Sequence, residues 1–128
     1  MKKIAFVLVA MFAIVLTGCK TERSKVTVTV EDSLGLPVAQ RYVFYADYAT
    51  LISDAIAPSP EELATGVSDV WEVATTNAAG FVTLDISLSV SKLKYCFMVY
   101  DMGTKDWKEK TVELRRGVNE EINFVVNQ

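Results

Sequence analysis

Apolar and polar residues alternate along most of the chain, and this alternation predicts seven short β-strands. The first strand is the clearest, because residues 25–31 alternate strictly and place Val26, Val28 and Val30 on one face. Similar stretches, separated by turn residues, follow at residues 38–48, 67–75, 81–86, 93–101, 107–114 and 120–126. Such a series favours an all-β protein, and we expect a seven-stranded Greek-key β-sandwich.

Residues 49–66 interrupt the strand pattern and predict one short helix. Ser59 suits the N-cap, Pro60 suits the first helical position, and Gly66 suits the stop. Two glutamates follow the proline, where the helix dipole favours acidic side chains. We expect one or two turns of helix, packed on the sandwich through Leu63.

The same alternation predicts the core. In residues 38–48, Tyr42 and Phe44 share one face of the strand, and Arg41, Val43 and Tyr45 share the other. We expect Phe44 on the inner side. The full inward set is Val26, Val28, Val30, Phe44, Val73, Leu84, Ile86, Phe97, Val99, Val112, Leu114, Ile122 and Phe124.

The first residues have a different pattern. Two lysines precede an uncharged apolar run of 13 residues (4–16), which ends at small residues and Cys19. This order is typical of a secretory signal peptide, which we expect to be helical. The alternative, a transmembrane helix, needs about 20 apolar residues.

The ending Leu16-Thr17-Gly18-Cys19 resembles the lipobox of bacterial lipoproteins. The resemblance implies diacylglyceryl transfer to the Cys19 sulfur and cleavage between Gly18 and Cys19. We therefore expect a signal peptide at 1–18, a lipidated tether at 19–24 and the sandwich at 25–128. Lys20 resembles an outer-membrane sorting signal, which implies a lipid anchor in the outer membrane; whether the domain faces the periplasm or the exterior stays open.

Composition narrows the function classes. Removing residues 1–18 leaves 110 residues, one domain's worth. The net charge of −3 gives no support for nucleic-acid binding. The chain has no histidine, which excludes Ser-His-Asp and Cys-His catalysis and histidine-ligated zinc. Cys96 lies in an apolar strand, and we favour a small buried side chain over a reactive thiol.

The order of turn motifs resembles the carboxypeptidase regulatory-like domain, a transthyretin-like (more broadly Ig-like) sandwich. The matching pieces are the turn at 31–38, the Thr-Thr-Asn-Ala-Ala-Gly-Phe turn at 75–81, the strand at 95–99 and the late turn at 116–119. The resemblance implies this fold but hardly a function. The transthyretin-like hydrolase of purine breakdown is rejected, because its histidines have no counterpart here.

Four aromatic residues are candidates for a binding surface. If Tyr45, Tyr48, Trp71 and Trp107 lie exposed together, they form a platform for a sugar ring or a protein partner. The alternative is that most of them pack in the core or at its rim.

Acidic residues offer a second candidate. Glu61 and Glu62, with Asp54 or Asp69, have the oxygen ligands that Ca²⁺ takes, but no calcium-loop spacing is present. We favour an acid-rich first helical turn and expect neither a metal nor a cofactor. Paired carboxylates for glycoside cleavage need a deep cleft, which a sandwich of this size seldom forms.

The sequence thus predicts a non-enzymatic, lipid-anchored binding or accessory module for a protein or glycan. The alternative is a structural protomer or spacer in an envelope assembly, built through β-strand addition.

Overall fold

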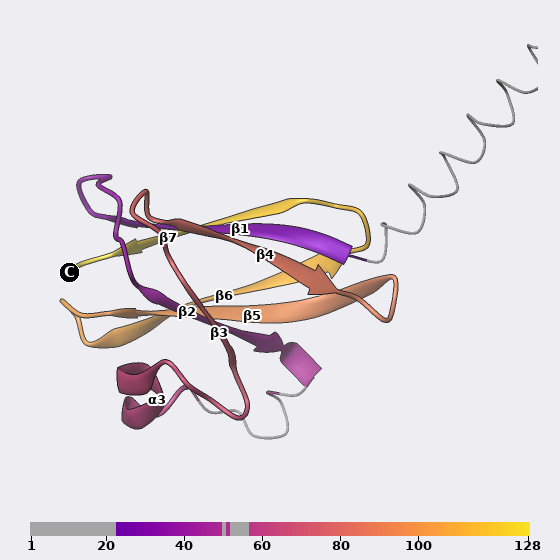
Figure 1. Ribbon diagram of the computed structural model, residues 1–128, viewed down its shortest axis with the longest axis horizontal. Helices are drawn as coiled ribbons and strands as arrows, with labels where there is room; N and C mark the ends of the chain where they lie inside the picture. The colour runs from indigo at the N-terminus through magenta and orange to yellow at the C-terminus, as the bar shows by residue number, and fades with distance from the viewer. Residues whose placement is uncertain (1–22, 50, 52–56) are drawn as a thin grey trace, which may run out of the picture.

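The protein is an all-β sandwich. The computed structural model describes residues 23–49, 51 and 57–128, and within them the chain forms seven strands and the short helix α3. The first sheet has the order β4-β1-β7, and the second has the order β3-β2-β5-β6. The strands are β1 (Arg23–Asp32), β2 (Tyr42–Asp47), β3 (Glu72–Thr75), β4 (Phe81–Ser87), β5 (Lys92–Asp101), β6 (Asp106–Arg115) and β7 (Glu120–Val126), with helix α3 (Pro60–Thr65) between β2 and β3. Figure 1 shows the two sheets as layers, with α3 outside the second sheet. The predicted signal peptide (1–18), Gly18 and Cys19 lie outside the described residues.

Strand β1 begins two residues earlier than the sequence predicts. Arg23 and Ser24, which we expected in the tether, continue the antiparallel register with β4 and pair with Ser87 and Ile86. Ser24 is fully buried, and its hydroxyl donates a hydrogen bond of 2.8 Å to the Val118 carbonyl. This bond satisfies the buried hydroxyl, so that a polar residue can extend the strand.

The third strand is shorter than predicted. Regular pairing covers only Glu72–Thr75, and Val67 and Val70 are exposed. The reason is local, because the Ser68 hydroxyl accepts the N–H groups of Val70 (3.2 Å) and Trp71 (2.9 Å). These donors are used in a turn rather than in the ladder of a sheet.

The core between the sheets contains most of the predicted residues. Val26, Val28 and Val30 of β1 face residues of the second sheet such as Phe97 and Val99. The prediction was wrong for Phe44 and Val73, which lie on the other face of the second sheet. The register explains this, since Val43, next to Phe44, takes the inner position.

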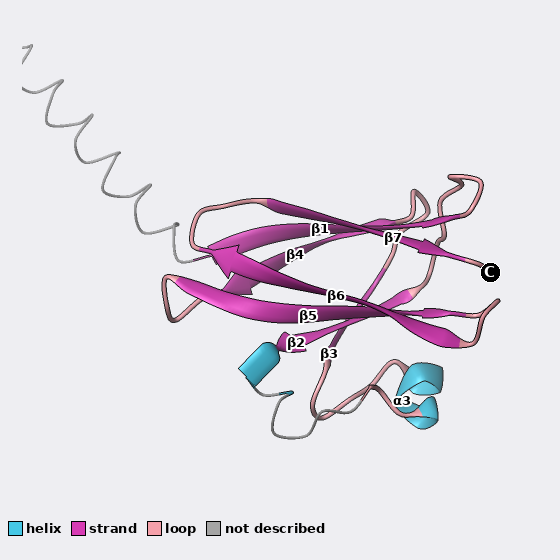
Figure 2. Cartoon of the chain, turned by 180° about the vertical axis from the view of Figure 1, so that it is seen from behind, coloured by secondary structure: helices cyan, strands magenta, loops and turns pink. Residues whose placement is uncertain are grey.

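A second apolar cluster covers the outer face of the second sheet. Phe44 and Ala46 of β2 and Cys96 and Met98 of β5 pack there under Leu51, Ala57, Leu63 and Trp71 from the segment between β2 and β3. A helical turn that starts at Tyr48 and helix α3 both belong to this cover (Figure 2). Because both faces of β5 are covered, residues 96–99 are all buried, and the period-two pattern disappears there.

The predicted turns after β1 and between β3 and β4 are confirmed. Asp32 Oδ1 accepts the N–H groups of Leu34 and Leu36, both at 2.9 Å, and Gly35 between them has φ +80°. Asn77 Oδ1 plays the same part in the turn before β4. Such self-bonded Asp and Asn turns are typical where a chain reverses tightly.

Candidate binding groove

The four aromatic residues predicted as a platform do not form one. Trp71 is 5% exposed and belongs to the outer cluster, and Trp107 is half-buried with its ring edge-on to Phe44 at 5.6 Å. Tyr45 points to the opposite side of the sheet, where it stacks on Phe97. Only Tyr48 is exposed, at 38%. The outer cluster needs the apolar area of the tryptophans for its own packing, so packing explains most of this set.

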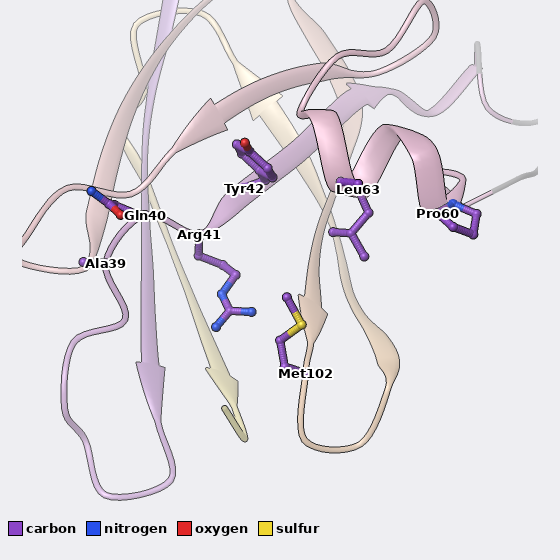
Figure 3. A pocket seen from close by; sticks show the side chains of 8 residues that line it. Ala39, Gln40, Arg41, Tyr42, Pro60, Leu63 and Met102 are labelled. Atoms are coloured by element: carbon purple, nitrogen blue, oxygen red, sulfur yellow. The ribbon is translucent and has the colours of Figure 1, made fainter.

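Helix α3 forms as the sequence predicts, and it builds one wall of a groove. The Ser59 side chain accepts the Glu62 N–H at 3.1 Å, and the Glu62 carboxylate accepts the Ser59 N–H at 3.0 Å. Gly66 ends the helix in the left-handed conformation. The capping box thus fixes the start and Gly66 fixes the end of a helix of six residues, which would be marginal by itself. Its residues Pro60, Leu63 and Ala64 line the groove, and Figure 3 shows Leu63 on the side of the helix that faces Arg41 and Met102.

The segment before β2 builds the second wall. Thr76, a buried residue, accepts the Arg41 N–H on its hydroxyl oxygen at 2.9 Å and donates that hydroxyl to the Val38 carbonyl at 2.8 Å. Gln40 between them has φ +55°, a conformation rarely adopted outside glycine. Two backbone bonds add to this pair, because the Gln40 N–H donates to the Thr76 carbonyl (2.9 Å) and the Thr76 N–H donates to the Arg41 carbonyl (3.0 Å). Thr76 therefore holds the segment before β2 through both its side chain and its backbone.

The hairpin between β5 and β6 builds the third wall, and Asp101 holds it. This carboxylate is fully buried; its Oδ1 accepts the N–H groups of Gly103 (2.9 Å) and Thr104 (3.1 Å), and its Oδ2 accepts that of Asn127 (3.0 Å). Burial alone would raise the pKa of Asp101, but these donors and the nearby Lys108 outweigh it and lower the pKa. Asp101 therefore stays charged and ties the hairpin to the end of β7.

These three walls enclose an open groove of about 500 Å³. Its lining comes from residues 39–42, from Pro60, Leu63 and Ala64 of α3, and from Met102 of the hairpin. Figure 3 shows the Arg41 side chain extending from the start of β2 toward Met102, while Leu63 faces both from the helix. Met102 is 51% exposed, so the groove opens to solvent on that side.

Arg41 is the charged residue of this groove. Among the described residues, its Nη1 is the one buried side-chain nitrogen or oxygen that has no hydrogen-bond partner. The ion pairs within the described residues involve the cations Arg23, Lys108 and Arg115, but not Arg41. A buried donor without a partner typically costs about 1–3 kcal/mol, which a bound acceptor would recover.

The groove lies at the end of the sandwich opposite the start of β1. Asp32, the last residue of β1, pairs with Val126, and Asp101 binds Asn127 next to it. Arg23 lies at the other end, opposite Ser87. The ten residues of β1 separate the two ends by about 30 Å (Figure 1).

Cys96 is not a nucleophile in this structure. It is 3% exposed in the outer cluster, as the sequence predicted. Burial, reinforced by the charge of Glu109, raises the pKa of the Cys96 thiol to about 11. The thiol is therefore protonated and shielded at neutral pH.

Among the acidic residues of the second candidate, Glu62 has a structural role. Glu61, Glu62 and Asp69 line one shallow hollow beside α3, while Asp54 lies outside the described residues. Hydrogen bonds from Ser68 and Ser59 lower the pKa of Glu62, whose carboxylate belongs to the capping box. Within the described part of the chain, no group of three acidic or cysteine residues is placed to hold a metal ion.

Arg41 was not among the predicted site residues, although the sequence contains a signal for it. It lies in phase with Val43 and Tyr45, on the face of β2 that packs into the sandwich. An arginine in phase with an inward apolar stripe, next to the end of a strand, indicates a cation held partly inside the protein. Its missing partner, however, can be recognised only in three dimensions.

Comparisons with known proteins add little beyond the fold. No family model matches the chain, and no curated protein is significantly similar to it. Among solved structures, chlorocatechol 1,2-dioxygenase from Pseudomonas putida is similar over 84% of this chain and 61% of the dioxygenase, with 10% sequence identity and a TM-score of 0.47. The matched region thus spans less than two thirds of the dioxygenase, and a likeness this distant does not transfer an activity.

In the described part of the chain, no helix combines the length and the apolar character needed to cross a bilayer.

Proposed function

We propose that this chain is a lipid-anchored envelope protein whose sandwich binds a protein or glycan without catalysing a reaction. The lipid would be carried by Cys19 and would hold the protein in the outer membrane. The observation that carries the binding role is the groove beside α3, with the unpartnered Nη1 of Arg41 in its wall. A preformed, mostly apolar hollow with a small number of polar groups is typical of ligand sites.

The position of the groove supports the same proposal. An anchor before β1 would hold the Arg23 end of the sandwich near the membrane, and the groove would then point away from it by the length of β1. A ligand could reach the groove without displacing the anchor.

A structural role through β-strand addition has weaker support. At the sheet edges, β3 has only four residues, and β6 carries alternating lysine and glutamate side chains. The Lys110 ammonium donates to the Asn123 carbonyl and covers part of β7. Short and charged edges resist strand addition. β4 is also an edge strand and is longer than β3. A position on β4 is therefore compared with the groove in the crosslinking experiment below.

The anchor is tested by metabolic labelling of cells with a radioactive fatty acid. We expect the full chain and Cys96→Ala to incorporate label, and Cys19→Ala to lose it and to leave the membrane fraction. Label that persists in Cys19→Ala would refute the anchor.

The binding role is tested by photo-crosslinking in intact cells. A benzophenone side chain replaces Met102 in the groove or Thr83 on the exposed face of β4. We expect a discrete crosslinked product from position 102 and none from position 83. Products from position 83 alone would favour the structural alternative, and no product from either position would contradict both.

A further inference from the structure

We propose that the groove binds the C-terminal carboxylate of a partner protein that ends in an apolar residue. This inference rests on the proposed binding function and names the ligand for the same site. It is drawn from the charge of Arg41, the apolar lining around it and the way two of the three walls are held.

The charged group defines the part of the ligand that must be anionic. A guanidinium offers two parallel N–H groups in one plane, which match the two oxygens of a carboxylate. The Arg41 Nη1 is buried and has no partner within the described part of the chain, so its donor capacity is unused there. A carboxylate in the groove would satisfy that donor and neutralise the charge in one step, after a small rotation of the guanidinium that turns Nη1 toward the groove.

The remaining lining defines the rest of the ligand. Leu63 and Met102 present apolar surface beside Arg41, and Pro60 adds apolar lining farther along the helix. An apolar last side chain would be desolvated favourably there. A uronic acid also carries a carboxylate, but most of its ring hydroxyls would lie against the apolar side chains of this lining, where Gln40 and Tyr42 are the uncharged polar residues.

Charge argues against a polyanion. Arg41 is the cation of the groove lining, and the whole chain has a net charge of −3. Nucleic acids and phosphate-rich headgroups require several cations on one face. A single carboxylate is the anion that one arginine in an acidic protein matches.

The site is also organised before binding. Thr76 holds the backbone on either side of Gln40, and Asp101 holds the turn that carries Met102. Two of the three walls are therefore positioned by hydrogen bonds to buried side chains, which reduces the entropy lost when a ligand binds. The volume of about 500 Å³ falls within the range of about 300–1,000 Å³ that is common for ligand pockets.

The experiment uses the full chain, purified from membranes in a nonionic detergent, and an array of short peptides. The last residue of the peptides is varied through all residue types, and each peptide is present as the free acid and as the C-terminal amide. We expect free acids that end in apolar residues to bind, and amidation to weaken binding by on the order of tenfold or more, the loss of one charge-assisted contact.

Variants assign the effect to the groove. Arg41→Gln should weaken binding on the order of tenfold, and Arg41→Lys should restore only part of it, because an ammonium lacks the planar fork. Met102→Glu should abolish binding by placing a negative charge in the groove. The matched control is Arg115→Gln, which removes an exposed arginine from β6 and should leave binding unchanged. Thermal unfolding of each variant confirms that it is folded.

Three results would overturn the inference. One is equal binding of free and amidated peptides, and another is the absence of any peptide binding. The third is that oligouronates bind, peptides do not, and Arg41→Gln abolishes the binding of the oligouronates. If crosslinking at position 102 still gives a product in cells, the proposed function stands and the ligand assignment alone fails.

Discussion

Replacing Asp101 with asparagine tests how strongly one buried carboxylate holds the end of the sandwich. The side chain is fully buried, and its two oxygens accept hydrogen bonds from Gly103, Thr104 and Asn127. An asparagine keeps one oxygen but turns an N–H₂ group toward donors on the other side. The variant therefore loses at least one charge-assisted bond and leaves a buried N–H facing another N–H.

The expected cost follows from those contacts. A hydrogen bond to a charged group contributes about 1.5–3 kcal/mol, and an unsatisfied buried donor costs about 1–3 kcal/mol more. We expect Asp101→Asn to lower the free energy of unfolding by about 3 kcal/mol, which lowers Tm by about 10–20 °C in a domain of this size. Urea unfolding followed by tryptophan fluorescence measures it. Asp106→Asn, in the same hairpin but exposed, is the matched control and should change stability little.

The same residue predicts a pH dependence. The folded-state pKa of Asp101 is lowered, so its contribution is complete above the unfolded-state pKa of about 3.9 and is lost as the pH falls through the lower folded-state value. The stability difference between the wild type and Asp101→Asn should therefore shrink as the pH falls below about 4. A loss under 1 kcal/mol at neutral pH, or a difference that grows in acid, would refute the reasoning.

Three further predictions follow from individual contacts. Cys96 should stay unmodified by a disulfide thiol reagent at about pH 8 and react only after denaturation, because burial raises its pKa to about 11; rapid labelling of the native protein would contradict this. Arg41→Met should raise the free energy of unfolding by about 1 kcal/mol in urea, since it removes a buried donor without a partner; a loss of stability would assign Arg41 a structural role. Gly80→Ala should destabilise by about 2 kcal/mol or more in thermal unfolding, because Gly80 has φ +79° and an added Cβ would lie 2.8 Å from Pro37 Cβ and 2.9 Å from the Val30 oxygen; an unchanged Tm would show that the turn relaxes.

The outer cluster explains why the chain contains more aromatic residues than a sandwich core can hold. The inner face of the second sheet is covered by the first sheet. Its outer face is covered by the segment between β2 and β3, which carries Leu51, Leu63 and Trp71. The same segment places α3 beside the start of β2. The groove is thus a product of this cover rather than of the sandwich alone.

The sequence by itself determined the local features of this protein. The alternation in β1, the capping box at Ser59 and the turns at Asp32 and Asn77 each depend on residues close together in the chain, and the structure has all of them. Local patterns are reliable here because hydrogen bonds over two to four residues and side-chain periodicity do not depend on distant contacts.

Tertiary structure decided which face of each strand is covered, and by what. Phe44 was assigned to the inner core, because alternation identifies two faces of a strand but cannot say that both will be buried. Burial of Trp71 and Trp107 follows from the same cover. Arg41 depends most on tertiary structure: its groove is built from β2, α3 and the β5–β6 hairpin, and a missing hydrogen-bond partner is a property of all three together.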